Sequence, residues 1–453
     1  MELKKYDNYK DSGVEWLGEI PEHWEVRKLK YLFDIIPSNV DKKTKEDELE
    51  VLLCNYVDVY KNDKITFDID FMNATASNSQ IEKLTLKKFD VIATKDSEDP
   101  NDIGVPALVL DNMNGVVCGY HLTLFRSKNS HILGNYLYWF LKSKMCSQYF
   151  STLARGITRY ALGTSAFSNL PLFNIIDVDE ITTIANYLDH KTTQIDTLIS
   201  KKEAFISLLQ EEKIAIINQA VTKGLDPNVP IKDSGIEWLG EIPEHWEVKK
   251  IKYLGKILSG FSFKSDDFIK KDGCRVMKIS NIQTMNIDWS DESFVPHSFY
   301  EIYSNFQIKK GDLVFALTRP IISTGIKASI VDIEDKILLN QRNAVLKPTD
   351  KLNVNWMYYI VFNPKFINHF ETLIDRTGQQ PNISSTDISN IPIPLPSKKE
   401  QELIINYVSI EEKKINNIIF KVQQEIELLK EYKTALISEV VTGKVDVRNE
   451  VLN

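Results

Sequence analysis

Residues 10–32 read Lys10-Asp-Ser-Gly-Val-Glu-Trp-Leu-Gly-Glu-Ile-Pro-Glu-His-Trp-Glu-Val-Arg-Lys-Leu-Lys-Tyr-Leu32, and the same stretch returns 222 residues later as Lys232 to Leu254. Of the 23 positions, 20 are identical, and the other three keep the chemical character of the side chain. A repeat at nearly half the chain length indicates an internal duplication. The two halves of the sequence are therefore expected to match.

Two long proline-free stretches, Glu180–Lys223 and Lys399–Gly443, extend the match at an offset of 220. Apolar residues recur in both at alternating spacings of three and four, the heptad-like pattern of a coiled-coil seam. The seam residues are Ile195, Ile199, Ile206, Leu209, Ile216 and Ala220 in the first stretch, and Ile415, Ile419, Val422, Ile426, Leu429, Leu436 and Val440 in the second. Lys202 and Lys213 interrupt the first seam. Gly224 and Pro227 are expected to end its helix.

The regions between the motif copies and the helices are mixed. Short β-rich runs bounded by Asn, Asp, Ser and Gly indicate strands of α+β domains. Predicted strands begin at Glu50, Lys64, Phe89, Val105, Cys274, Asp312 and Ala344, and a helix is predicted from Asn135 to Ser143. These inserts match only in outline, so the chain resembles two near-identical frames that hold two divergent inserts.

The order of the parts is cyclic. The first helix leads directly into a motif copy, whereas the copy that would follow the second helix stands at the N-terminus. The sequence thus predicts a cyclically permuted, pseudo-twofold α+β fold with two antiparallel helices, and a first motif that packs near the end of the second helix. The predicted segments are 1–26 (first motif copy), 27–177 (first insert), 178–248 (helix and second motif copy), 249–397 (second insert) and 398–453 (C-terminal helix).

The composition of the 453 residues, 43% hydrophobic and 26% charged, is that of a globular protein. No apolar run approaches the roughly 20 residues of a membrane helix, and the charged N-terminus is unlike a signal peptide. Four scattered cysteines lack zinc or disulfide spacing. These features predict a cytoplasmic protein with no membrane partner. The net charge of −8 argues against broad nonspecific nucleic-acid binding but leaves a local basic cleft open.

Catalytic signatures are scarce, because phosphate-binding, dinucleotide-binding and HExxH motifs are missing. One alternative is a metal-dependent nuclease that uses Asp312 with Glu334 and Lys336. Asp312 also follows Gly311 at an expected strand start, which favours a structural role. His23 and His245 occupy equivalent places and are expected to be structural residues beside Trp24 and Trp246. No metal site is predicted.

Polar loops of the inserts offer side chains that can reach base edges and phosphates. The candidate DNA-binding residues are Lys95, His121, Arg155, Thr158, Arg159 and Tyr160 in the first insert, and Arg319, Gln341, Arg342, Gln379, Gln380 and Asn382 in the second. The repeated motif could close each insert against the helices or present a docking surface twice. Its candidate docking residues are Trp16, Leu17, Trp24, Trp238, Leu239 and Trp246.

The second motif copy, preceded by a long helix that ends Ala220-Val-Thr-Lys-Gly-Leu-Asp-Pro227, resembles the specificity subunits of type I restriction–modification systems. The resemblance covers the whole chain. The second insert, with Gly260-Phe-Ser-Phe-Lys264 and Lys310-Gly-Asp-Leu313, looks like a common form of the family's target-recognition domain. The first insert departs from it, with Phe89-Asp90 where Gly-Asp is usual.

The resemblance implies a subunit without catalytic activity, in which each target-recognition domain reads one half of a bipartite double-stranded DNA sequence. It also implies an antiparallel coiled coil between the domains. Two modification (methyltransferase) subunits would dock on the conserved regions, and restriction (translocase–nuclease) subunits would join to cut. S-adenosylmethionine, ATP and Mg²⁺ would belong to the partners, with no cofactor in this chain.

Helix length is compatible with this role. A helix of about 30 residues spans roughly 45 Å, and half-sites one DNA turn apart are separated by about 34–36 Å. A stand-alone nuclease and a scaffold whose inserts bind proteins remain the alternatives. Because the net charge is negative, we also hypothesise that the chain alone binds DNA weakly and that its partners complete a basic clamp.

Overall fold

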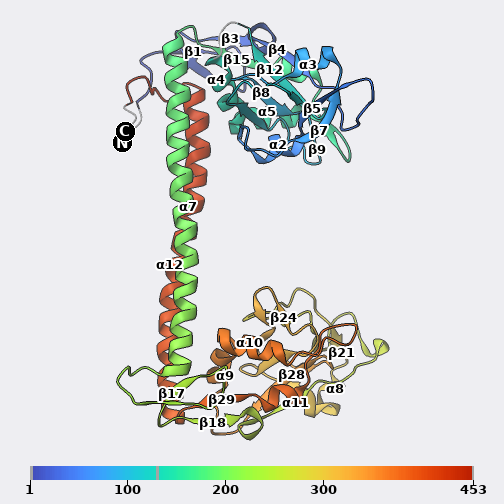
Figure 1. Ribbon diagram of the computed structural model, residues 1–453, viewed down its shortest axis with the longest axis vertical. Coiled ribbons are helices and arrows are strands. Elements are labelled where there is room, and N and C mark those ends of the chain that lie inside the picture. Colours follow the sequence, from blue (N-terminus) through green and yellow to red (C-terminus); the bar gives the residue numbers. More distant parts are fainter. Residues whose placement is uncertain (1–3, 129–131, 451–453) are drawn as a thin grey trace. The chain divides into compact units, whose positions relative to one another are not determined.

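The computed structural model describes residues 4–128 and 132–450. Residues 1–3 of the predicted segment 1–26, residues 129–131 of the segment 27–177 and residues 451–453 of the segment 398–453 lie outside it. The chain divides into two compact units (Figure 1). One unit contains residues 1–203 together with 423–453, and the other contains residues 204–422. The first unit therefore joins the beginning of the chain to its end, as the cyclic order of the parts predicts.

One long helix follows each domain in the sequence: α7 (Val178–Lys223) with 46 residues and α12 (Lys398–Val441) with 44. Within the first unit, Lys433 Nζ lies 2.7 Å from Asp196 and Lys202 Nζ lies 2.5 Å from Glu425. These pairs require the helices to run antiparallel there, because the α12 partner number falls as the α7 number rises. In the second unit, Lys213 Nζ donates to Asn416 at 3.4 Å in the same sense. The predicted antiparallel pair is confirmed in each unit.

The predicted seam is also confirmed. Ile195, Leu209 and Ala220 are buried, and the other seam residues of α7 are half-buried. The seam of α12 follows the same alternation, with Ile415, Val422, Ile426, Leu436 and Val440 buried. Lys202 and Lys213 are half-buried too, and each finds an acceptor on the opposite helix. Within the described residues, neither these helices nor any other is long and apolar enough to cross a membrane.

The first insert folds into a domain, called the first recognition domain after the resemblance above, that is built on a five-stranded sheet in the order β4-β12-β8-β10-β6. Its strands are β4 (Phe33–Pro37), β12 (Leu122–Ser127), β8 (Val91–Thr94), β10 (Pro106–Val109) and β6 (Lys64–Ile65). Alternate side chains of β8 enter different cores, since Val91 and Ala93 face one cluster and Ile92 the other. All four β8 residues are buried because both faces of the sheet are covered. The predicted strand at Lys64 was too long: it ends at Ile65, and the chain then turns and exposes Phe67.

The remaining elements of this domain complete its two cores. A second sheet has the order β11-β5-β7, from β11 (Val116–Cys118), β5 (Leu49–Cys54) and β7 (Met72–Ala76). The helices are α1 (Leu29–Leu32), α2 (Tyr56–Lys61), α3 (Asn78–Leu84), α4 (Ile132–Lys142), α5 (Lys144–Leu153) and α6 (Thr164–Ser168). Helix α4 confirms the helix predicted at Asn135–Ser143 and packs on β8, β10 and β12.

The second recognition domain repeats this plan. Its main sheet has the order β19-β28-β23-β26, which corresponds to β4-β12-β8-β10. The strands are β19 (Gly255–Ser259), β28 (Asn343–Pro348), β23 (Leu313–Ala316) and β26 (Ala328–Ile330), and a second sheet contains β21 (Phe294–Val295), β20 (Cys274–Met277), β27 (Ile337–Leu339) and β22 (Gln307–Ile308). Helices α8 (Ser298–Ile302), α9 (Val354–Val361), α10 (Pro364–Thr372) and α11 (Ser385–Asn390) complete it. The duplicated α+β architecture is confirmed.

Both copies of the repeated motif form the same short strands. In the first copy, β1 (Tyr9–Asp11) pairs with β2 (Glu19–Pro21), and β3 (Glu25–Lys28) pairs with β15 (Pro171–Asn174). In the second, β16 (Ile231–Asp233) pairs with β17 (Glu241–Pro243), and β18 (Glu247–Lys250) with β29 (Pro392–Leu395). Each copy therefore joins the end of its own insert, which makes the motif part of the frame.

A carboxylate, buried in the first copy and partly exposed in the second, holds each motif copy to the first turn of a long helix. Glu180 of α7 accepts from Trp24 Nε1 at 3.1 Å and from the Tyr6 hydroxyl at 2.7 Å, and it lies 2.8 Å from His23 Nε2. Glu400 of α12 accepts from Trp246 Nε1 at 2.9 Å and lies 3.0 Å from His245 Nε2. The structural role expected for both histidines is confirmed. We call each group the His–Trp–Glu cluster.

The end of α12 packs on the first motif copy, as predicted. The Tyr9 hydroxyl donates to Gly443 O at 3.0 Å, and the Tyr136 hydroxyl donates to Val441 O at 2.8 Å. Gly443 has a φ of 70°, and a Cβ there would lie 2.5 Å from the Pro21 ring. Only glycine satisfies both conditions, so the helix must end at this point.

Replacing Glu180 by alanine is expected to destabilise the first unit by about 3–5 kcal/mol, because two buried donors lose their acceptor. Glu400→Ala is the matched control. The Glu400 side chain is 26% exposed, compared with 1% for Glu180, and no tyrosine hydroxyl donates to it. Its loss is expected to cost about 1–2 kcal/mol. Hydrogen exchange of the amides in the two motif copies measures both; an equal or larger loss for Glu400→Ala would contradict the assignment.

Candidate nucleic-acid interface

Three loops of the first recognition domain meet beyond the ends of β8 and β12. The Lys95 amide donates to His121 O at 3.0 Å, and the Leu162 amide donates to Lys95 O at 2.8 Å. Strand β14 (Tyr160–Ala161) lies between β13 (Arg155–Gly156) and β9 (Asp96–Ser97). The structure therefore brings all six candidate DNA-binding residues of this domain onto adjoining loops, which we call the first loop cluster.

Asp96 organises the polar side chains of the first loop cluster, although the sequence analysis did not single it out. Its carboxylate accepts from Arg159 Nη2 at 2.5 Å and lies 2.7 Å from His121 Nδ1. Arg159 remains 56% exposed, whereas the Asp96 side chain is only 11% exposed. The available signal was that Asp96 directly follows the candidate Lys95, since a carboxylate in such a loop commonly orients a neighbouring guanidinium.

The other candidates of this cluster differ in availability. Lys95 is half-buried: its Nζ donates to Ser38 O at 3.0 Å and lies 4.4 Å from the Tyr120 ring centroid. Burial lowers the pKa of Lys95 below its ordinary value. Arg155 and Thr158 are exposed, and Tyr160 is half-buried. Arginine and threonine are thus the most accessible groups, while Lys95 also supports the loops.

The second recognition domain has an equivalent cluster, which we call the second loop cluster. The Leu317 amide donates to Arg342 O at 2.8 Å, and the Ile383 amide donates to Leu317 O at 2.8 Å. Thr318 Oγ1 and Asn382 Oδ1 are 3.1 Å apart in a hydrogen bond. The structure brings together all six candidates of this domain: Arg319, Gln341, Arg342, Gln379 and Asn382 are exposed, and Gln380 is half-buried.

The two clusters share one backbone frame. The bonds Lys95–His121 and Leu162–Lys95 correspond to Leu317–Arg342 and Ile383–Leu317. The two domains can be aligned on these bonds. In that alignment Arg342 corresponds to His121, Thr318 to Asp96 and Gln380 to Arg159. Equivalent backbone positions thus carry different hydrogen-bonding groups, as two readers of different sequences require.

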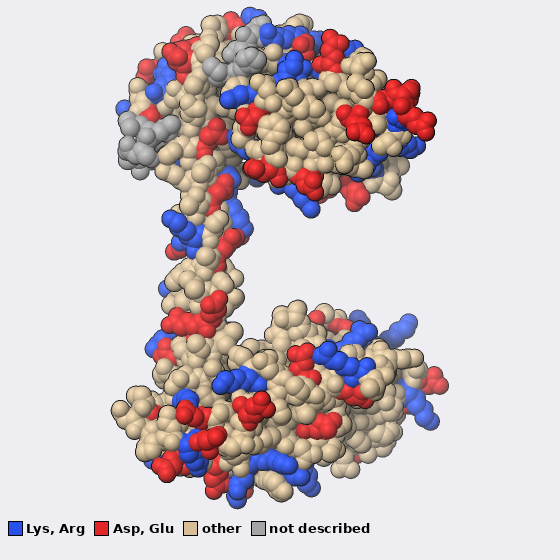
Figure 2. Space-filling model, in the orientation of Figure 1, with Lys and Arg blue, Asp and Glu red and all other residues tan. Residues whose placement is uncertain are grey.

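The face of each unit that Figure 2 shows is mixed in charge. On the face seen in Figure 2, Lys and Arg are interspersed with Asp and Glu in each unit. This distribution agrees with the net charge of −8. Individual side chains therefore carry more of the interface than a broad basic field does.

The chain is similar to known proteins in sequence and in fold. Residues 243–428 match the family model of the type I restriction modification DNA specificity domain. The type I restriction enzyme MjaVIII specificity subunit of Methanocaldococcus jannaschii is 26% identical over 452 residues, covering 99% of this chain and 98% of that protein. The chain is thus similar over nearly its whole length to a type I specificity subunit, and its residues 243–428 match the specificity-domain model.

Solved structures of the family share the fold. A chain from a study of complex assembly and conformational transition of the type I R-M system aligns with a TM-score of 0.69 at 13% identity, covering 93% of this chain and 98% of that one. The HsdS subunit from Thermoanaerobacter tengcongensis aligns with a TM-score of 0.56 at 14% identity, covering 94% and 98%. The two-domain fold of this chain is therefore one that these solved structures also have.

The nuclease alternative finds no support in this specificity-subunit fold. Asp312 is buried, and its carboxylate lies 2.5 Å from Lys347 Nζ and accepts from the Lys309 amide at 2.9 Å. Asp90 occupies the equivalent place and pairs with Arg126 at 2.6 Å. Among the described residues, no three His, Cys, Asp or Glu side chains are grouped so as to hold a metal ion. Asp312 therefore has a structural role.

The turns before Asp90 and Asp312 have the same kind of backbone conformation, although the first insert has Phe89 where the second has Gly311. Gly311 has a φ of 90°, and Phe89 has a φ of 68° at the corresponding place. Phenylalanine rarely adopts this left-handed conformation, since its Cβ crowds the backbone. The fold therefore keeps the turn although the residue differs, and the strand that follows is equivalent.

The candidate docking residues of the motif lie mostly in the core of the specificity subunit. Trp24 and Trp246 are fully buried, and Leu17, Leu239 and Trp238 are buried as well. Trp16 is half-buried and stacks on Tyr149, with ring centroids 4.5 Å apart. These side chains fasten the motif to its domain, so the docking role stays a prediction for the motif's exposed polar edge.

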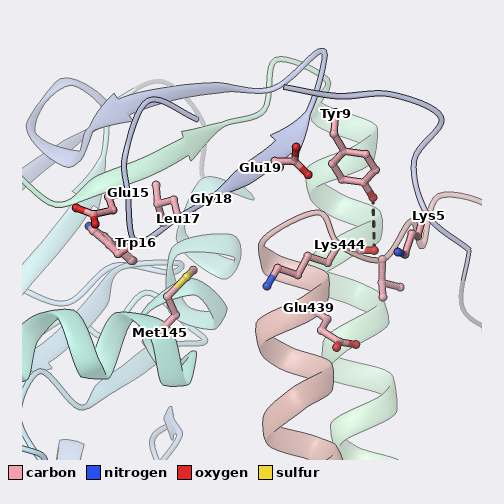
Figure 3. A pocket seen from close by; sticks show the side chains of 11 residues that line it. Lys5, Tyr9, Glu15, Trp16, Leu17, Gly18, Glu19, Met145, Glu439 and Lys444 are labelled. Carbon is pink, nitrogen blue, oxygen red and sulfur yellow. Dashed lines mark hydrogen bonds between the residues drawn. The ribbon is translucent and has the colours of Figure 1, made fainter. Parts of the chain in front are cut away.

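A cavity of about 730 Å³ adjoins that edge in the first unit (Figure 3). Its lining combines the first motif copy, Met145 of α5 and the end of α12. Glu15, Glu19 and Glu439 face it together with Lys5 and Lys444. A cavity with both signs of charge suits a polar protein segment better than an apolar ligand.

The long helices expose further apolar residues that sequence reasoning treated only as repeat markers. Leu428 of the first unit is 63% exposed, and its counterpart Leu208 of the second unit is 61% exposed. Both lie one position off the seam, which was the available signal. The two leucines are thus exposed at matching positions of the duplicated frame.

Asp312→Ala is expected to lower stability by about 1–3 kcal/mol, because Lys347 would lose its partner at a site that is partly open to solvent. Gln379→Ala, at an exposed loop position, is the control and is expected to change stability by less than about 0.5 kcal/mol. Guanidinium chloride unfolding measures both. Metal-dependent DNA cleavage by the purified chain, abolished in Asp312→Ala without loss of stability, would restore the nuclease.

Proposed function

We propose that this specificity subunit reads a bipartite DNA sequence, with the first loop cluster on one half-site and the second on the other. The observation that carries this proposal is the pair of loop clusters that share a backbone frame but differ in their side chains. An identical frame places the readers alike, and the different side chains select different bases. The chain itself is proposed to be non-catalytic.

Double-stranded DNA fits the chemistry of both clusters. Arginine pairs with guanine O6 and N7, glutamine and asparagine pair with adenine N6 and N7, and serine or threonine can contact either base. Arg159, Arg342 and Gln379 are exposed groups of these kinds. Exposed arginines and lysines nearby can add phosphate contacts that set the register without reading the sequence.

Partner subunits supply the reactions in this proposal. Two modification subunits dock on the duplicated frame, for which the matched exposed Leu208 and Leu428 and the polar edge of the motif are the candidate contacts. They would bind S-adenosylmethionine and methylate adenine, and restriction subunits with ATP and Mg²⁺ would cleave. The complex would act in the cytoplasm, where its DNA lies.

Exchanging residues 249–397 for the corresponding insert of a relative is expected to change one half of the methylated sequence and leave the other half unchanged. Each reading surface lies within one recognition domain, so the two halves are separable. Mapping methylated adenines in DNA from cells that carry the chimaera and the modification subunits measures this. An unchanged bipartite sequence would refute DNA reading by the second insert and favour a protein-binding scaffold.

The purified chain is expected to bind DNA weakly and with little sequence preference at physiological salt, in the range of about 10⁻⁴–10⁻⁶ M typical of nonspecific contacts. Addition of modification subunits is expected to tighten binding and to steepen its dependence on salt, because more phosphates are neutralised. Fluorescence anisotropy with a target duplex at several salt concentrations measures both. Tight, specific binding by the chain alone would overturn this expectation.

A further inference from the structure

We propose that Arg159 selects a guanine in the half-site of the first recognition domain, and that Asp96 is the residue that positions it. This assignment rests on the proposed function. The proposed function gives the first domain a reading surface, and here one side chain of that surface is assigned to one base. Three observations carry it: the orientation of the guanidinium, the charges around it and the contrast with the second domain.

The Arg159 guanidinium is fixed on one edge and open on the other. Its Nε and Nη2 donate to Asp96 Oδ1 at 3.2 Å and 2.5 Å, and Nη2 also lies 3.3 Å from His121 Nδ1. Among the described residues, Nη1 has no hydrogen-bond partner. The side chain is nevertheless 56% exposed. Two parallel N–H donors match the O6 and N7 acceptors of guanine in the major groove. A guanidinium already held in place loses less conformational entropy on binding.

Asp96 is itself held rigidly. Its second carboxylate oxygen lies 2.7 Å from His121 Nδ1, and its side chain is 11% exposed. Strand β9, which contains Asp96, pairs with β14 directly after Arg159, with Ala161 opposite Asp96. The two residues are therefore brought together by backbone pairing. This arrangement makes Asp96 a positioning residue.

The charges beside Arg159 disfavour a phosphate ligand. Arg159 lines a cavity of about 370 Å³ together with Ser97, Tyr56 and Tyr60 and with three acidic residues, Glu98, Asp99 and Asp102. Carboxylates repel a phosphate, whereas the edge of a base carries no net charge. Arg155 of the same loop contrasts with it, since it is exposed and pairs with no carboxylate in the described part of the chain. Arg155 is thus suited to a phosphate, and Arg159 to a base.

The second domain lacks this arrangement. Gln380 stands at the place of Arg159, and Thr318, at the place of Asp96, is hydrogen-bonded to Asn382. No guanidinium is held over the equivalent position, although the backbone is the same. The guanine contact assigned to Arg159 therefore has no counterpart at the equivalent place of the second domain.

The test uses the complex with its modification subunits and maps methylated adenines for the wild type and three variants. Arg159→Gln is expected to lower the preference for guanine at one base pair of the first half-site by at least about fivefold. Asp96→Asn is expected to relax the same base pair by less. Arg155→Gln, the matched control, is expected to weaken methylation at all sites without changing the sequence. The second half-site is expected to stay unchanged in every variant.

If Arg159→Gln abolishes methylation, competition binding tests the assignment instead. The competitors are duplexes substituted at each base pair of the first half-site. One substitution is expected to weaken the wild-type complex and to have no further effect on Arg159→Gln, since both changes remove the same contact. Independent effects at every base pair, or an unchanged methylated sequence in Arg159→Gln, would overturn the assignment. If the wild-type complex methylates no bipartite sequence, the proposed function fails instead.

Discussion

A carboxylate in the first turn of each long helix, buried at Glu180 and partly exposed at Glu400, is the constraint on which the rest of the structure depends. Glu180 and Glu400 accept from the indole N–H of Trp24 and Trp246 and so fasten a motif copy to the start of a helix. A buried carboxylate that loses its donors is strongly destabilising. The residues around it can therefore change little, which gives a physical reason for a motif with 20 of 23 positions identical between its copies.

Stability and reading are carried by different layers of each recognition domain. Strands β8 and β23 are completely buried, and their alternate side chains fill separate cores. The loops beyond these strands hold their shape through backbone hydrogen bonds, which do not depend on side-chain identity. Exposed side chains on such loops can change at little cost in stability. Two domains of one chain can thus diverge in sequence preference while keeping one fold.

Sequence periodicity was enough to predict the seam from Ile195 to Ala220 and the packing of the first motif on the end of α12. Both follow from repetition and helical spacing, which are properties of the chain alone. The role of Asp96 could not be predicted in this way, because its partners His121 and Arg159 come from loops that only the sheet brings together. The same holds for Glu180, a charged residue in a first helical turn that a sequence pattern would leave in solvent. The short β6 and the left-handed Phe89 are further places where tertiary context overrides local propensity.

Duplication also has a thermodynamic consequence for discrimination. A mismatched base pair costs about 1–3 kcal/mol in a protein–DNA complex, and such costs are roughly additive for separated positions. One small domain with a few reading side chains therefore discriminates only modestly. Two domains on one frame add their free energies of discrimination, so their selectivity ratios multiply. Because the surface is mixed in charge, little of this selectivity would be masked by nonspecific attraction to phosphates. An acidic chain with two precise contact surfaces suits a subunit whose task is to choose a sequence.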